Sequence, residues 1–294
     1  MPAALPFGRV LTAMVTPFAA DGSLDLAETR RLAEFLVDEM KNDALVVNGT
    51  TGESPTTDDA EKLALLKAVK EAVGDRAKVL AGVGTNETSA TIKRCHDAVD
   101  AGCDGVLVVT PYYSKPPKDA LYEHFLMVAD ATDLPVMLYD IPGRSAIPIP
   151  EDVIIELAKH PRIVAVKDAK GDVVSSAKVM AETDLAYYSG DDAMTLPLLS
   201  VGGVGVVGTS THFTGARTKQ AIDAFTAGRL DEAVRLYREL LPVYTGVFAT
   251  QGCMLVKAGL RTRGWSTGVL RRPLKPASEE QTATFVALLD AAGL

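Results

Sequence analysis

The sequence predicts an α/β fold in which eight parallel strands, each followed by a helix, close into a (β/α)₈ barrel. Its 294 residues suffice for one such barrel. Short apolar segments alternate with helical patterns, which favours parallel strands joined by right-handed crossovers. An open doubly wound sheet is the alternative. The expected strands cover residues 10–15, 44–47, 77–82, 105–109, 135–138, 163–166, 185–188 and 201–207.

The expected helices lie between these strands and beyond the last one. Residues 25–40 are typical, because their leucine, phenylalanine and methionine side chains recur on one side of a helix. Similar patterns occupy residues 57–73, 88–101, 118–131 and 151–159. After about Arg229 no further strand is expected, and helices cover residues 230–248, 251–260 and 278–292. We therefore expect a barrel over residues 1–228 and a C-terminal helical extension over residues 229–294.

Composition and charge exclude several classes of protein. With 47% hydrophobic and 23% charged residues the chain is typical of a folded globular protein. A net charge of −8 argues against a nucleic-acid partner. No apolar run reaches the ~18 residues that span a membrane, and the first residues lack a signal-peptide pattern. Cys95, Cys103 and Cys253 show no zinc or disulfide spacing. The expectation is a cytoplasmic protein without a metal.

A lysine directly follows the expected strand Ile163–Val166. This strand contains four consecutive apolar residues, so we expect it to be buried on both faces. Burial disfavours the ammonium form of a lysine, and a neutral amine is a nucleophile that forms Schiff bases with carbonyl substrates. The alternative is that Lys167 extends from the strand end into water.

Other polar side chains also follow the expected strands. In this barrel all carboxyl ends of the strands face one side, where active sites form. The backbone N–H groups of Gly49–Glu53 suit a small carboxylate. Arg144 suits a second carboxylate through bidentate pairing, and the Tyr139 phenol suits proton transfer to a lysine adduct. The residues at these ends are Thr50, Thr51, Tyr113, Tyr139, Arg144 and Lys167.

Three further patterns are weak. The segment Gly203–Gly208 matches G-x-G-x-x-G, but its glycines interrupt a strand instead of following one, so close approach of a ligand or another backbone is the better explanation. The four histidines lack metal-ligand spacing. Asp191 and Asp192 are more typical of a helix N-terminus than of a cation site.

Five motifs, each at a different strand end, resemble those of the dihydrodipicolinate synthase family. This family belongs to the pyruvate-dependent class I aldolases, which include N-acetylneuraminate lyase. The chain departs mildly at Asp140, where the family commonly has Asn, and at Val207, where it often has Ile. The segment Thr209–Phe213 departs further. The motifs are Gly49–Ser54, Val109–Tyr113, Leu138–Arg144, Val166–Ala169 and Ser189–Asp192.

The resemblance implies a reaction and a role for each residue. Lys167 would form an imine with pyruvate, and the derived enamine would attack aspartate 4-semialdehyde. The implied relay is Thr50, Tyr139 and Tyr113, the last reaching in from a neighbouring subunit. The implied substrate-binding residues are Thr51, Arg144, Gly190 and Val207. No metal or organic cofactor is implied, and the implied assembly is a homotetramer.

Two alternatives remain open at this point. One is another pyruvate aldolase, such as N-acetylneuraminate lyase or a keto-deoxy sugar-acid aldolase. The other is a non-catalytic ligand sensor on the same barrel. The resemblance also implies an interface pocket near Ser54, Asn86 and Tyr112, which binds lysine in lysine-sensitive relatives. Ala90 stands where those relatives place a carboxylate, and Lys62 would repel a cation, so we expect weak or absent inhibition by lysine.

Overall fold

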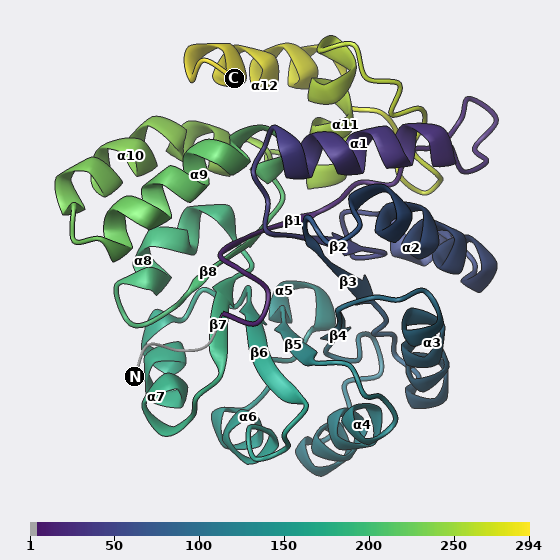
Figure 1. Ribbon diagram of the computed structural model, residues 1–294, viewed down its shortest axis with the longest axis vertical. Coiled ribbons are helices and arrows are strands. Elements are labelled where there is room, and N and C mark those ends of the chain that lie inside the picture. Colours follow the sequence, from purple (N-terminus) through teal and green to yellow (C-terminus); the bar gives the residue numbers. More distant parts are fainter. Residues whose placement is uncertain (1–4) are drawn as a thin grey trace.

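The computed structural model describes residues 5–294 and confirms the closed parallel barrel (Figure 1). Each strand pairs in parallel with its sequence neighbour, and the last pairs with the first, Val10 opposite Val206. This closure rules out the open sheet. The strands are β1 (Val10–Ala13), β2 (Ala44–Val47), β3 (Lys78–Gly82), β4 (Gly105–Val109), β5 (Val136–Asp140), β6 (Ile163–Asp168), β7 (Ala186–Ser189) and β8 (Gly205–Gly208).

Strands β5 and β6 each end two residues later than expected, at Asp140 and Asp168. The expected end of β1 and the expected start of β8 were also wrong, each for a hydrogen-bonding reason. Strand β1 ends before Val15, whose N–H donates to His212 Nε2 at 3.1 Å instead of to a neighbouring strand. Strand β8 starts at Gly205 instead of Val201. The N–H of Gly203 bonds to Leu198 O at 2.9 Å, so this segment closes the preceding helix. A side chain at Gly205 would collide with the Arg9 carbonyl oxygen, so close backbone approach is the reason for this glycine.

The helices surround the barrel and continue past it. Their bounds agree with the expected ranges to within a few residues, because caps such as the Asp58 capping box fix where they begin. The barrel helices are α1 (Leu26–Asp38), α2 (Asp59–Val73), α3 (Thr88–Asp100), α4 (Lys118–Asp130), α6 (Glu151–Leu157), α7 (Val173–Glu182), α8 (Thr195–Leu199) and α9 (Thr211–Thr226). One helix of four residues, α5 (Pro142–Ser145), lies in the loop after β5 and was not expected.

Three helices follow the barrel helices, α10 (Leu230–Gly246), α11 (Gly252–Thr262) and α12 (Glu279–Ala291). Helix α10 lies beside α9, and α11 lies between α12 and the barrel (Figure 1). The division of the chain at residue 228 into a barrel and a separate extension stays a prediction. Within residues 5–294, no helix is both long and apolar enough to cross a bilayer.

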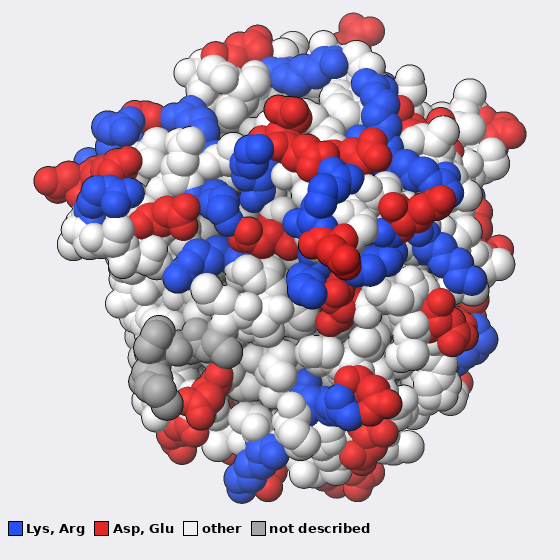
Figure 2. Space-filling view, viewed as in Figure 1, with Lys and Arg blue, Asp and Glu red and all other residues white. Residues whose placement is uncertain are grey.

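Apolar side chains form two main layers. One fills the barrel interior and includes Leu80, Met137 and Ala165, and the other packs between the strands and the helices. Each fully buried Leu or Val contributes about 1.5–3 kcal/mol relative to exposure. The three cysteines are free and buried in the core. On the face seen in Figure 2, acidic and basic side chains are intermixed over the helices, not segregated by sign.

Candidate active site

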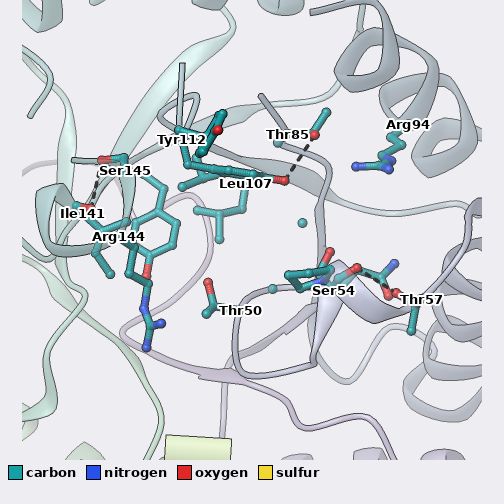
Figure 3. A pocket seen from close by; sticks show the side chains of 18 of the residues that line it. Thr50, Ser54, Thr57, Thr85, Arg94, Leu107, Tyr112, Ile141, Arg144 and Ser145 are labelled. Carbon is teal, nitrogen blue, oxygen red and sulfur yellow. Dashed lines mark hydrogen bonds between the residues drawn. The ribbon is translucent and has the colours of Figure 1, made fainter. Parts of the chain in front are cut away.

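A pocket of about 850 Å³ opens beside the carboxyl ends of β2 to β5. Thr50, Tyr139 and Arg144 line it together with Tyr113, so four of the expected site residues share one cavity. In Figure 3, Thr50 and Arg144 lie on one side, whereas Ser54, Thr57 and Arg94 lie on the other. The pocket therefore has two halves.

Lys167 lies at the carboxyl end of β6 and is 5% exposed. This burial rules out the alternative that its side chain extends into water. The backbone of Lys167 pairs with Tyr139 on β5, which places the two side chains on the same face. Lys167 Nζ lies 4.2 Å from the centre of the Tyr139 ring. A primary amine held against a phenol in an apolar wall has the surroundings that Schiff-base chemistry requires.

Gly190 leaves room for this lysine. A Cβ atom at Gly190 would lie 3.1 Å from Lys167 Cγ and 2.8 Å from the Ala169 side chain. Any larger residue would displace the lysine or its strand. Val207 is buried in the barrel interior, in the same apolar cluster as Tyr139.

The loop after β2 carries the two threonines. The N–H of Gly52 donates to Gly49 O at 3.1 Å, which turns the loop tightly. Thr50 lines the pocket, whereas Thr51 Oγ1 lies 3.4 Å from Thr209 Oγ1, in the loop after β8. Thr50 therefore faces the pocket, whereas Thr51 faces the loop after β8.

The remaining two expected residues lie on more exposed parts of the rim. Arg144 is on α5, and one of its guanidinium nitrogens donates to Gln251 Oε1 at 3.0 Å. Tyr113 has a left-handed backbone with φ of 73° and is 89% exposed in the isolated chain. The Tyr113 side chain therefore extends from its own chain at the edge of the pocket.

A buried hydrogen-bond network supports the loop after β8, and sequence reasoning missed it. Asp192 is fully buried and accepts from the N–H groups of Thr209 and Ser210 at 3.0 Å. The Asp191 side chain caps a short 3₁₀ turn, in agreement with the expected helix N-terminus. Burial lowers the pKa of His212 to about 4, so this histidine is neutral and accepts the Val15 N–H. The unusual segment Thr209–Phe213 was the only sequence signal.

Asp140 lies on β5, paired in register with Asp168 on β6, and its side chain points to the outer side of these two strands. Its side chain is 0% exposed, and its Oδ1 accepts the Ile149 N–H at 3.1 Å. Within residues 5–294, Oδ2 has no hydrogen-bond partner, and Lys170 Nζ lies 3.7 Å from it. Burial raises the pKa of Asp140 to about 6.

Replacing Asp140 with Asn should stabilise the protein at neutral pH. Between about pH 4 and 6 the folded state keeps a proton that the unfolded state releases, so the free energy of unfolding falls as pH rises through this window. Asp140→Asn removes that loss and should gain ~1–3 kcal/mol at pH 8. Urea unfolding at pH 8 and pH 4 measures it. The gain should vanish at pH 4, and equal stability at pH 8 would contradict the explanation.

The second half of the pocket is basic. Lys62 is 4% exposed, and its Nζ donates to Ser54 O at 2.9 Å and to Thr57 Oγ1 at 2.8 Å. Burial lowers the pKa of Lys62 to about 8. Asp59 binds Lys93 and Arg94 at 3.1 and 3.0 Å, so its charge is already paired.

Comparison with known proteins agrees with this geometry. The model of the dihydrodipicolinate synthetase family matches residues 6–292. The chain belongs to this family. The curated relative from Cutibacterium acnes, named 4-hydroxy-tetrahydrodipicolinate synthase, is 63% identical over 284 residues, which cover 97% of each chain. The relative of the same name from Acidothermus cellulolyticus is 60% identical and covers 98% of this chain and 93% of its own.

Solved structures of the family superimpose closely on the chain. The structure of the Cyanidioschyzon merolae enzyme with lysine bound has a TM-score of 0.97 at 40% identity, covering 99% of this chain and all of that one. A dihydrodipicolinate synthase from Bacillus anthracis has a TM-score of 0.94 at 41% identity, covering 97% and 98% of the two chains. The expected family and the expected barrel are thus confirmed.

Proposed function

We propose that this chain condenses pyruvate with L-aspartate 4-semialdehyde to give 4-hydroxy-tetrahydrodipicolinate, in the cytoplasm, for lysine and diaminopimelate biosynthesis. The single observation that carries the proposal is the placement of Lys167. Its amine is buried against Tyr139, which lines the same pocket as Thr50 and Arg144. The names of its relatives support the same reaction.

The proposed chemistry starts from the primary amine of Lys167, buried beside Tyr139. Lys167 Nζ attacks the ketone carbon of pyruvate, and loss of water leaves an iminium ion. Removal of a proton from the methyl carbon gives an enamine, whose carbon attacks the aldehyde of the second substrate. The amino group contributed by aspartate semialdehyde then attacks the iminium carbon. This attack closes the ring and releases Lys167 as the free amine. The iminium itself accepts the electrons in the deprotonation step.

Each nearby group has a role in this sequence. The proton relay consists of Tyr139, Thr50 and Tyr113. It protonates the hydroxyl that leaves as water during imine formation, and later the aldehyde oxygen during the addition. The Thr50–Thr51 loop binds the pyruvate carboxylate, and Arg144 binds the carboxylate of the aldehyde. Gly190 and Val207 shape the space around the imine. Of these groups, Tyr113 is the one that we propose comes from a second subunit.

One set of incubations separates this function from its alternatives. Pyruvate alone should form a reducible imine, and pyruvate with aspartate semialdehyde should form product. Cleavage of N-acetylneuraminate or of a keto-deoxy sugar acid, without product from the semialdehyde, would assign another pyruvate aldolase. Absence of any imine would leave only a ligand sensor.

The active assembly should contain at least two subunits, and we propose a homotetramer. Because Tyr113 is 89% exposed in the isolated chain, it is available to complete a partner's site. Tyr113→Phe and Lys167→Ala should each be inactive or nearly so. Mixed and allowed to exchange subunits, they should recover up to about a quarter of the activity of the unmodified enzyme, since only mixed interfaces give a complete site. The measurement is turnover with native mass spectrometry.

Hybrids that are proven to form but stay inactive would show that Tyr113 serves its own chain. One solved structure similar to this chain is described as the first monomeric dihydrodipicolinate synthase variant. Gel filtration of Tyr113→Phe controls for dissociation.

Inhibition by L-lysine should be weak, with a half-inhibition concentration above ~1 mM. Ala90 offers no carboxylate, Lys62 lines the pocket next to Ser54, and Asp59 is already paired with two cations. A buried ammonium without a partner is costly. Titration of L-lysine in a coupled assay measures it, with Ala90→Glu as the variant expected to gain sensitivity. Inhibition of the unmodified enzyme at micromolar lysine would show that another acid pairs with the ligand.

A further inference from the structure

Helix α11 is unusual because all residues from Gly252 to Leu260 are buried, including a lysine. Lys257 is the single charged residue within this stretch. A buried ammonium requires a charged or hydrogen-bonding partner, so the environment of Lys257 indicates what the helix does.

Lys257 binds a carboxylate of the catalytic loop. Its Nζ lies 2.7 Å from Glu53 Oε1, and both side chains are 0% exposed. The same Nζ donates to Val269 O at 2.8 Å and lies 4.5 Å from the centre of the Phe18 ring. The second oxygen of Glu53 accepts the backbone N–H of Arg271 at 2.9 Å. The Glu53 side chain is therefore held by groups from the C-terminal part of the chain.

Glu53 in turn fixes the loop that carries Thr50 and Thr51. It adopts a left-handed backbone with φ of 57°, which is costly for a residue with a side chain. In this conformation its N–H donates to Thr50 O at 3.1 Å. The neighbouring Gly52 O accepts from Thr16 Oγ1 at 2.7 Å. The side-chain ion pair joins these backbone hydrogen bonds in holding the loop at its carboxyl end, and it links this end to α11.

The beginning of the same helix contacts the other carboxylate-binding group. Gln251 immediately precedes α11 at its N-cap position, and its Oε1 accepts from Arg144 at 3.0 Å. Lys257 follows six residues later, so the two contacts are separated by about 9 Å along a rigid helix. Helix α11 and the residue that precedes it thus contact the Thr50–Thr51 loop through Glu53 and contact Arg144 directly.

We propose that α11 sets the spacing between the two carboxylate subsites, with Lys257 positioning the Thr50–Thr51 loop through Glu53 and Gln251 positioning Arg144. This inference rests on the proposed function for the identity of the two substrates. It gives the C-terminal part of the chain a role in substrate binding, although none of its residues needs to touch the substrate.

The test is a pair of variants, each of which should raise the KM for a different one of the two substrates. Lys257→Met should raise the KM for pyruvate about tenfold or more, because displacement of a binding group by ~1 Å has effects of this size. Gln251→Ala should raise the KM for aspartate semialdehyde several-fold and leave the pyruvate dependence of imine trapping unchanged. Lys219→Met is the matched control, since Lys219 pairs with Asp43 next to the amino end of β2. Its KM values should stay unchanged.

A second variant removes the risk that an unpaired Glu53 prevents folding. Glu53→Gln combined with Lys257→Met replaces the pair by neutral groups of similar size, which folded proteins usually tolerate. The combined variant should show the raised KM for pyruvate, with an effect no larger than that of the more impaired single variant. A folded double variant whose KM for pyruvate stays within twofold of the unmodified value would overturn the proposal.

Different results would contradict this inference and the proposed function. If the unmodified protein forms no product from pyruvate and aspartate semialdehyde, the proposed function fails. If it does, and both KM values are insensitive to Lys257→Met and Gln251→Ala, then α11 is a structural helix only. Imine trapping at varied pyruvate concentrations measures the effect on pyruvate binding in the absence of the second substrate.

Discussion

Lys167→Arg should fold normally and lose at least about a thousandfold in turnover, because a guanidinium remains protonated and cannot form the imine. Lys167 is buried next to Tyr139, and arginine keeps a long unbranched side chain and much of the volume. The loss should appear in kcat. Circular dichroism and urea unfolding establish that the variant is folded, and a coupled assay measures turnover.

The matched control is Lys170→Arg, three residues further along the chain. Lys170 Nζ lies 3.6 Å from Asp168 and 3.7 Å from Asp140, on the outer side of the strands. An arginine preserves those charge contacts, so this variant should keep turnover within a few-fold of the unmodified enzyme. If Lys167→Arg keeps substantial activity while Lys170→Arg loses it, the nucleophile has been assigned to the wrong lysine.

Tyr139→Phe should reduce kcat by ~10²–10⁴-fold, the range over which a positioned acid or base contributes. The ring stays in place beside Lys167, whose Nζ lies 4.2 Å from its centre, so the packing is kept and only the hydroxyl is lost. Proton transfer during imine formation and aldehyde addition should slow, whereas pyruvate should still bind. Stopped-flow measurement of imine formation separates these steps.

Tyr188→Phe provides the control for a lost tyrosine hydroxyl in the barrel. Tyr188 is the register partner of Lys167 on the other neighbouring strand, but its hydroxyl donates to Gly8 O at 2.9 Å. Its removal should affect stability more than kcat. Equal kcat losses in the two variants would indicate that Tyr139 acts through packing and not through its hydroxyl.

The fold and much of the pocket could be predicted from local sequence. The alternation of apolar strands and helices requires only short-range patterns, and the carboxyl ends of parallel strands must meet on one side. For that reason Thr50, Tyr139 and Arg144 line one pocket as expected. The side of β6 on which Lys167 lies follows from the register of that strand with β5.

Contacts between distant segments could not be predicted in this way. Strand β1 ends early because His212, 197 residues further along the chain, accepts the Val15 N–H. The ion pair of Glu53 with Lys257 joins two segments that local patterns treat as a loop and an apolar helix. A lysine within such a helix was the only available signal. The contacts that support the pocket are therefore tertiary, whereas the residues that we expect to bind substrate lie at strand ends that local patterns predict.

Reductive trapping tests the central claim most directly. The protein is incubated with pyruvate and borohydride, digested, and analysed by mass spectrometry for the position of the pyruvate-derived group. We predict one such group per chain, on Lys167, with loss of activity in proportion to labelling. An adduct on Lys170 or on any other lysine, or complete absence of an adduct in the active enzyme, would contradict the account.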